Sequence, residues 1–329
     1  GDGVPGPGDK AIIDLAGDYT VTVDQNVSVS VIEMGGASGT QTLSLTSRVL
    51  TIQNQALLGA ATVFRFSGGS LRGNGNAFFD GQVIWTGGEM YDPGWKVLRG
   101  IASFSGNAGK NIRAGSRVRN ESEVTWSGTN LNFGEGSQWV NAPGSLFDIR
   151  TDGDIGTFGL TGSFRNEGEL RRSAGEGVCL IGVPFENAGV LTPQTGTLRF
   201  SRSLSQSAGG LTFLAGGVLR TDSPYALNDG VLTGAGTITG SVANIGASVQ
   251  PGTGLGTLVV TGNYTQAAGG VLEMESAGEV ASGSFDALTI GGTATLGGTF
   301  RLLTGGFAAT PGESYPLFTY AGGASGSSF

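Results

Sequence analysis

Short stretches in which apolar and small polar residues alternate predict β-strands near the start of the chain. Residues 20–24, 27–31, 42–46 and 49–52 each alternate Val, Leu or Ile with Thr, Ser or another polar residue. This period of two is typical of a strand with one buried face, and β-branched residues favour it. The longest stretch without Gly or Pro, residues 40–58, also alternates and shows no helical period. The pattern therefore predicts an all-β protein.

A frame consisting of an apolar residue, Asn two positions later, then Gly and Leu recurs along the chain at residues 164–170 and 185–191. Looser copies lie elsewhere, and the first four asparagines of the series are separated by 21, 25 and 21 residues. A repeat near 20 residues indicates a solenoid. We expect the asparagines to form a ladder, in which each amide donates to one neighbouring coil and accepts from the other. The predicted ladder residues are Asn120, Asn141, Asn166, Asn187 and Asn244.

Parallel strands need crossover connections, and a chain without helices can supply them only by winding round a common axis. The sequence therefore predicts a parallel β-helix with coils of about 20 residues. Residues 1–10 are rich in Gly, Pro and Asp and are expected to form an arm or linker. Residues 11–329 are expected to form a single continuous β-helix.

A second repeat places an aromatic residue before a turn of small residues. The aromatic positions are Phe66, Trp85, Phe104 and Trp126, with steps of 19, 19 and 22 residues. Equivalent residues in a solenoid stack about 4.8 Å apart. Two interpretations remain open: the rings fill the core, or they form an external strip on which sugar rings could lie. In the external arrangement, Trp85 and Trp126 are candidate glycan-binding residues.

Composition and charge exclude several classes of function. Sixty-two glycines and only 13% charged residues fit many short strands joined by tight turns, rather than a disordered chain. The net charge of −8 argues against a nucleic-acid partner. The absence of histidine excludes His-based triads and His-ligated metals. No apolar run approaches the ~18 residues of a membrane-spanning helix, so direct membrane insertion is not expected. The single cysteine, Cys179, is expected to be buried.

The densest acidic group comprises Asp148, Asp152 and Asp154. Its Asp-Gly-Asp run resembles part of a calcium loop, but the terminal Glu of such a loop is missing. We therefore expect no metal and no cofactor, with calcium as the alternative. The same carboxylates could serve a polysaccharide lyase or glycosidase, with Glu169 as a partner one coil away. We expect no enzymatic activity and retain the three aspartates as candidate binding residues.

A series of motifs in the last third of the chain carries a family resemblance. Residues 230–240 read GVLTGAGTITG, and residues 249–252 read VQPG. LGTLVVTGNYTQ follows at 255–266, and GTATLGGTF at 292–300. These motifs resemble the repetitive passenger regions of bacterial autotransporters and haemagglutinin-like adhesins. The resemblance covers residues 227–329 and, more loosely, 11–58, whereas the middle matches only as generic coils. It implies a right-handed parallel β-helix and brings no catalytic motif with it.

The resemblance implies a secreted protein of the bacterial cell surface or of an extracellular fibre, acting as an adhesin-like scaffold. We expect the chain to be a mature fragment or a segment of a larger protein, with its export route open. Neither end of the sequence shows a polar cap, so end-to-end self-assembly is expected. The expected partners are copies of the chain, other surface proteins and glycans. The alternative function is a polysaccharide-degrading or glycan-binding β-helix protein.

Overall fold

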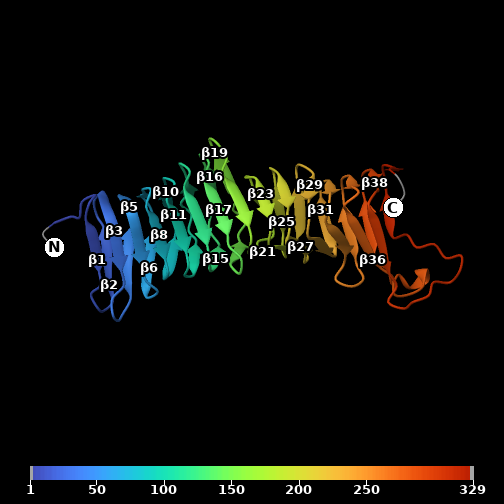
Figure 1. Ribbon diagram of the computed structural model, residues 1–329, viewed down its shortest axis with the longest axis horizontal. Coiled ribbons are helices and arrows are strands. Elements are labelled where there is room, and N and C mark those ends of the chain that lie inside the picture. The colour runs from blue at the N-terminus through green and yellow to red at the C-terminus, as the bar shows by residue number, and fades with distance from the viewer. Residues whose placement is uncertain (1–2, 327–329) are drawn as a thin grey trace. The chain divides into compact units, whose positions relative to one another are not determined.

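The computed structural model describes residues 3–326 (Figure 1). It confirms the predicted all-β class and the parallel β-helix: parallel sheets form a β-solenoid of about 13 coils of about 21 residues. Among the described residues there is no α-helix, and the only helical turn is the 3-10 turn Val280–Ser282.

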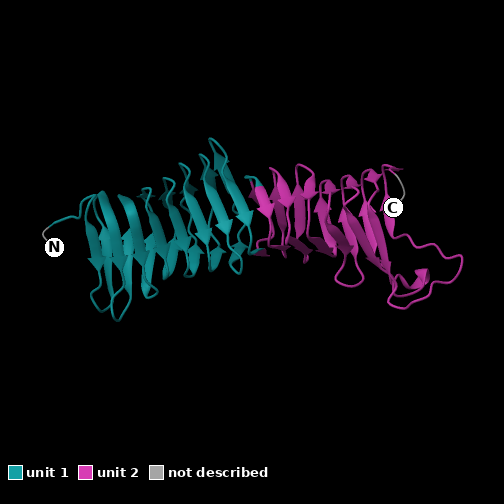
Figure 2. Cartoon of the chain, in the orientation of Figure 1, with its two compact units in different colours: residues 1–170, 182–184 teal, residues 171–181, 185–329 magenta. Residues whose placement is uncertain are grey.

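The chain divides into two compact units (Figure 2). Unit 1 comprises residues 1–170 and 182–184, and unit 2 comprises residues 171–181 and 185–329. The chain passes from unit 1 to unit 2 within β21 (Glu169–Ala174). The single continuous β-helix over 11–329 stays a prediction, as does the arm over residues 1–10. The first strand begins at Lys10.

Unit 1 contains two sheets of parallel strands. Sheet A has a single strand in each of its first three coils and two strands in each later coil, because a corner interrupts the strand. The strands of sheet A are β1 (Lys10–Ile13), β3 (Val27–Met34), β5 (Val49–Leu58), β7 (Ser70–Arg72), β8 (Asn76–Phe79), β10 (Gly88–Met90), β11 (Trp95–Leu98), β13 (Lys110–Ile112), β14 (Arg117–Asn120), β16 (Leu131–Gly134), β17 (Gln138–Asn141), β19 (Ile155–Phe158) and β20 (Ser163–Asn166). The strands of sheet B are β2 (Tyr19–Val23), β4 (Gln41–Leu45), β6 (Thr62–Phe66), β9 (Gln82–Trp85), β12 (Ala102–Phe104), β15 (Glu123–Trp126) and β18 (Leu146–Arg150).

Unit 2 repeats this arrangement, with two strands of sheet A and one strand of sheet B in each coil. Its sheet A strands are β22 (Val178–Ile181), β23 (Phe185–Asn187), β25 (Thr197–Phe200), β26 (Leu204–Gln206), β28 (Val218–Thr221), β29 (Tyr225–Leu227), β31 (Gly236–Thr239), β32 (Val242–Asn244), β34 (Thr257–Val260), β35 (Tyr264–Gln266), β37 (Ala287–Ile290), β38 (Ala294–Thr295), β40 (Phe318–Tyr320) and β41 (Ala324–Ser325). Its sheet B strands are β24 (Val190–Pro193), β27 (Leu211–Leu214), β30 (Val231–Gly234), β33 (Ser248–Pro251), β36 (Val271–Glu275) and β39 (Thr299–Leu303).

Alternation along each strand places every second residue in the core, where side chains of successive coils stack. In unit 1 the predicted aromatic row is in register from β6 to β15, and all of its rings are fully buried. Phe66 stacks on Trp85 with ring centroids 5.7 Å apart, and Phe104 meets Trp85 edge-on at 5.0 Å. In unit 2 most of the buried core side chains are aliphatic, and Cys179 of β22 is buried in the same core.

Corners between strands require glycine where the next coil approaches closely. Gly230 has φ +81°, and a Cβ atom there would lie 2.0 Å from the carbonyl oxygen of Gly210 in the preceding coil. Only glycine fits such a position, because it tolerates positive φ and leaves room for the neighbouring backbone. The high glycine content is thus explained partly by the tight stacking of corners.

Candidate functional site

The asparagine ladder in unit 1 lies inside the corner that follows the second sheet A strand of a coil. Asn120, Asn141 and Asn166 occupy equivalent positions on β14, β17 and β20 and are fully buried. Asn120 Nδ2 donates to Asn141 Oδ1 at 2.8 Å, and Asn141 Nδ2 donates to Asn166 Oδ1 at 2.9 Å. Each donor also reaches a backbone carbonyl, that of Leu146 or Glu169, at 2.9 Å. These amides hold successive coils together and are not accessible to a ligand.

In unit 2 the same corner combines amides with hydroxyl groups. Asn187 Nδ2 donates to Leu211 O at 3.1 Å and to Gln206 Oε1 at 3.4 Å. Gln206 Oε1 also accepts from Thr212 Oγ1 and Tyr225 OH, both at 2.9 Å. Burial raises the pKa of the Tyr225 hydroxyl well above its ordinary value. The phenol therefore stays protonated and acts as a donor within the core.

A second hydroxyl-containing network lies further along unit 2. Asn244 Nδ2 donates to Tyr264 OH at 3.4 Å and to Val271 O at 3.2 Å. Tyr264 OH in turn donates to Gln266 Oε1 at 2.8 Å. The asparagine spacing did not predict the tyrosines, because their hydroxyls reach the ladder from inward positions that a sequence pattern assigns to the apolar core.

Buried cationic side chains donate to backbone carbonyl groups at other corners, and no sequence pattern predicted them. Lys96 is 1% exposed, and its Nζ donates to the carbonyl oxygens of Tyr91, Asp92 and Gly94, each at 2.9 Å. Burial lowers the pKa of the Lys96 ammonium to about 7. In unit 2 the fully buried Arg172 donates to backbone carbonyls in the same way. Carbonyl groups left unpaired by a tight turn thus receive side-chain donors.

The two candidate binding tryptophans point into the core. Trp85 and Trp126 are both fully buried, and their indole N–H groups donate to the carbonyl oxygens of Gly87 at 3.1 Å and Thr129 at 3.0 Å. A sugar ring can stack only on an exposed aromatic face, so the external-strip interpretation is corrected to a core stack. The repeat in the sequence predicted that the rings stack, but not whether they face the core or the solvent.

The three candidate aspartates occupy different environments. Asp148 faces outward on β18, but it is fully buried beneath Arg150, whose Nε lies 2.7 Å from Asp148 Oδ2. Asp152 is exposed in the following corner, and Asp154 is half-buried there. Within residues 3–326, no group of three or more His, Cys, Asp or Glu side chains is arranged to hold a metal ion. Their binding role stays a prediction.

A polar recess in unit 2, which the sequence analysis missed, brings three carboxylates to one place. It has a volume of about 440 Å³ and lies against the outward face of sheet B. Gln250 Nε2 donates to Glu273 Oε1 at 3.2 Å, and Arg301 Nη1 lies 2.7 Å from Glu273 Oε2. Its lining residues are Thr233, Gln250, Pro251, Gly252, Thr253, Gly254, Glu273, Glu275 and Asp286.

Asp286 forms the buried side of the recess. It is 2% exposed, and its two carboxylate oxygens accept from the backbone N–H groups of Gly256 at 2.8 Å and Glu275 at 2.7 Å. Burial raises the pKa of Asp286 despite these hydrogen bonds. Glu275 and Asp286 become neighbours because residues 276–285 leave the coil and return, joined by an antiparallel bridge between Ser276 and Phe285. The arrangement can accept hydrogen bonds from hydroxyl groups.

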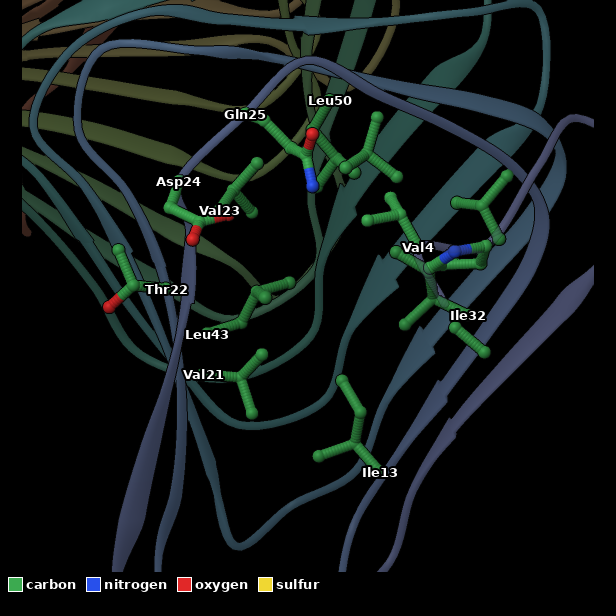
Figure 3. A pocket seen from close by; sticks show the side chains of 14 residues that line it. Val4, Ile13, Val21, Thr22, Val23, Asp24, Gln25, Ile32, Leu43 and Leu50 are labelled. Atoms are coloured by element: carbon green, nitrogen blue, oxygen red, sulfur yellow. The ribbon is translucent and has the colours of Figure 1, made fainter. Parts of the chain in front are cut away.

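A further cavity lies beside the first coil of unit 1. Its volume is about 280 Å³ and its lining is mostly apolar (Figure 3). Ile13 projects into it from β1, and Val21 and Val23 project into it from β2. Val4 also lines it. The cavity is thus lined by side chains of the first coils of unit 1.

Comparison with known proteins finds no matching family model, curated protein or solved structure. The autotransporter and haemagglutinin-like resemblance therefore stays a prediction from the motifs. In the described part of the chain, no helix is both long and apolar enough to cross a bilayer.

Proposed function

We propose that the chain is a secreted structural protein of the bacterial surface or of an extracellular fibre, with the β-helix as an adhesin-like scaffold. The observation that supports this role is the stack of about 13 coils, held by backbone pairing and by buried amide ladders. A solenoid of this kind presents long, regular faces while its polar side chains stabilise the corners. In this proposal the chain has no catalytic activity and needs no cofactor. Its partners are copies of itself, other surface proteins and glycans.

The location is tested with antibodies raised against the purified chain and applied to intact cells of the source bacterium. Surface labelling without permeabilisation, or recovery of the chain in sheared fibres, is the expected result. Labelling that requires permeabilised cells would contradict the proposed location. Adhesion is tested separately by the binding of chain-coated beads to host cells and to immobilised glycans, with uncoated beads as the control.

The recess in unit 2 supports glycan recognition as a second candidate function. Glu273, Glu275 and Gln250 line it together with backbone groups, so the site offers acceptors to sugar hydroxyls. Its three carboxylates favour neutral or amino sugars over acidic ones, because like charges repel. We expect a glycan array to show such ligands, with binding lost in Glu275→Gln.

Glu123→Gln is the matched control for that experiment. Glu123 also faces outward from sheet B, on β15 in unit 1, and lies outside the recess. Equal binding by Glu275→Gln and the unsubstituted chain would contradict the recess as the site. Release of reducing ends from a bound polysaccharide would identify a degrading enzyme rather than a binding protein, and we expect none.

A further inference from the structure

The floor of the polar recess belongs to a row of outward side chains along sheet B of unit 2. Thr233 of β30 lies in register with Gln250 of β33, and Gln250 Nε2 donates to Glu273 Oε1 of β36 at 3.2 Å. In the other direction, Thr233 lies in register with Phe213 of β27. Neighbouring parallel strands are about 4.8 Å apart, so Phe213 lies one coil from the recess.

Phe213 differs from four outward aromatic residues of unit 1. Each of those four has an arginine guanidinium over its ring, 4.2 to 4.9 Å from the centroid: Phe78, Tyr91, Trp95 and Phe158. Phe213 is half-buried on the outward face of β27, and in the described part of the chain no arginine or aromatic ring stacks on it. A ring with a free face beside polar groups is suited to stack on a sugar ring.

Hydrogen bonds hold the side wall of the recess in place. Thr233 Oγ1 donates to Gly252 O at 2.6 Å, and the backbone groups of Gly234 and Gly252 pair in both directions at 3.0 and 3.1 Å. Residues 252–254 are thereby fixed beside β30. Gly254 has φ +114°, and a Cβ atom there would meet no atom within 4 Å. The recess is therefore preformed, and this part of its rim carries no side chain that would obstruct a ligand.

Two of the three carboxylates in the recess lack a cationic partner. Glu273 pairs with Arg301 at 2.7 Å. Neither Glu275 nor Asp286 forms an ion pair with a Lys or Arg among residues 3–326. Burial is the main cause of the raised pKa of Asp286, and the negative charge of Glu275 raises it further. A ligand cation between these two carboxylates would relieve their repulsion, so charge complementarity favours a ligand that carries an ammonium group.

We propose that unit 2 binds a linear glycan of amino sugars with free amino groups, which lies along the outward face of sheet B. One sugar places its ammonium group between Glu275 and Asp286, and another stacks its ring on Phe213. The sugars between them meet Thr233 and Gln250, whose side-chain oxygens accept hydrogen bonds from hydroxyl groups. This inference rests on glycan recognition by the recess, and it adds the chemical class, the direction and the length of the ligand.

Calorimetric titration with β-1,4-linked glucosamine oligomers, in a weakly acidic buffer that protonates their amino groups, tests the ligand and its length. β27 and β36 are separated by three strand spacings, roughly 14 Å, so a disaccharide fills only the recess and a tetrasaccharide also reaches Phe213. We expect the tetrasaccharide to bind about tenfold more tightly than the disaccharide. The fully N-acetylated tetrasaccharide, which is uncharged, should bind about tenfold more weakly than the free amine. Phe213→Ala should reduce the affinity for the tetrasaccharide to that for the disaccharide, whereas Glu275→Gln should weaken the binding of both.

Phe78→Ala is the matched control, since it removes a half-buried outward ring in unit 1 and should leave both affinities unchanged. Phe213→Leu keeps an apolar side chain without a ring, and it replaces Phe213→Ala if circular dichroism shows that the alanine variant does not fold. Equal affinities for the disaccharide and the tetrasaccharide, or for the free and the N-acetylated oligomers, would overturn the inference.

The glycan array separates this failure from failure of glycan recognition itself. Binding of other glycans that is lost in Glu275→Gln, without binding of the glucosamine oligomers, would overturn the inference and leave the recess as a glycan site. If no glycan binds in a way that depends on Glu275, both the inference and glycan recognition by the recess are wrong.

Discussion

The two units build the same coil around different cores. Unit 1 fills its coils with aromatic rings that contact one another along the stack, centred on Trp139. Unit 2 fills its core mainly with Leu, Val and Ile, and it adds the buried hydroxyls of Tyr225 and Tyr264 to its corner ladder. Strand pairing is nevertheless parallel and regular in both. The coil is therefore specified by backbone register and corner chemistry, and the core tolerates either filling.

The comparison can be followed experimentally because the four tryptophans lie in unit 1, at positions 85, 95, 126 and 139. Tryptophan fluorescence reports on the aromatic unit, whereas far-UV circular dichroism reports on strands throughout the chain. Coincident unfolding curves from the two probes would support the single continuous β-helix predicted from the sequence. Separate transitions would indicate that the two cores unfold independently.

The largest expected effect comes from removing the central ring of the aromatic core. Trp139 contacts the rings of Phe104, Phe133, Phe147 and Phe164, with centroid distances from 5.2 to 6.1 Å. Trp139→Ala leaves a large cavity and is expected to lower the free energy of unfolding by about 3–5 kcal/mol. Urea titration followed by circular dichroism measures the loss.

Two matched variants sharpen that result. Trp139→Phe keeps a ring and should lose less stability than Trp139→Ala. Trp95→Ala removes an outward, half-buried indole beside Arg117 and is expected to cost about 1 kcal/mol or less. Equal losses from Trp139→Ala and Trp95→Ala would show that the aromatic core does not stabilise unit 1.

The next effect is a pH dependence that originates in unit 1. The pKa of Lys96 is about 7 in the folded chain and 10.5 ordinarily, so between these values the unfolded chain binds more protons. The free energy of unfolding therefore rises with pH across this window, by about 1.4 kcal/mol per unit. From pH 7.5 to 9.5 we expect a gain of about 2–3 kcal/mol in urea titrations.

Lys96→Met removes the titrating group and should flatten this rise. The flattening is partial, because burial also lowers the pKa of Lys110 and adds a slope of the same sign. If the free energy of unfolding of Lys96→Met rises with pH as steeply as that of the unsubstituted chain, this rise does not originate in Lys96. Below pH 7 both states bind the proton of Lys96, so this group contributes no slope there.

A smaller loss is expected from breaking the ladder in unit 2. Asn187 is fully buried, and its Nδ2 donates to Leu211 O and Gln206 Oε1. Asn187→Ala leaves these acceptors short of a donor and should cost about 1–3 kcal/mol. Asn228→Ala, at an exposed position of the same unit, should change stability by less than about 0.5 kcal/mol. Similar losses in the free energy of unfolding for the two variants would contradict a stabilising role for the ladder.

The smallest effect concerns the hydroxyl group that distinguishes the unit 2 corner. Tyr225→Phe removes the donor to Gln206 and the contact with Thr212 Oγ1 at 2.6 Å, at a cost of about 1 kcal/mol. The raised pKa of Tyr225 also implies that stability falls as pH rises above 10, where the unfolded phenol ionises first. Above pH 10, the free energy of unfolding should fall less in Tyr225→Phe than in the unsubstituted chain. An identical fall in the two would contradict the role of this hydroxyl.

The sequence predicted those features in which one residue type must recur in each coil. Asn120 and Asn141 are recognisable because an amide ladder needs an amide at every step. The direction of Trp85 was not predictable, since period-two alternation is the same for either face of a strand. Lys96 was missed because its partners are turn carbonyls, which become unpaired only in three dimensions. The recess was missed because Glu275 meets Asp286 only after the intervening loop returns.

The amide ladder of unit 1 has a direction, since Asn120 donates to Asn141 in the following coil and Asn141 donates to Asn166. Deletion of residues 120–140 would remove one coil and leave Asn141 in the place of Asn120. The ladder would then continue with an identical amide. Deletion of half as many residues would shift the register, so that the inward residues of successive coils no longer stack. Insertions and deletions in the gene are therefore tolerated most easily in steps of one coil, so that tandem duplication is the natural route by which such a chain changes its length.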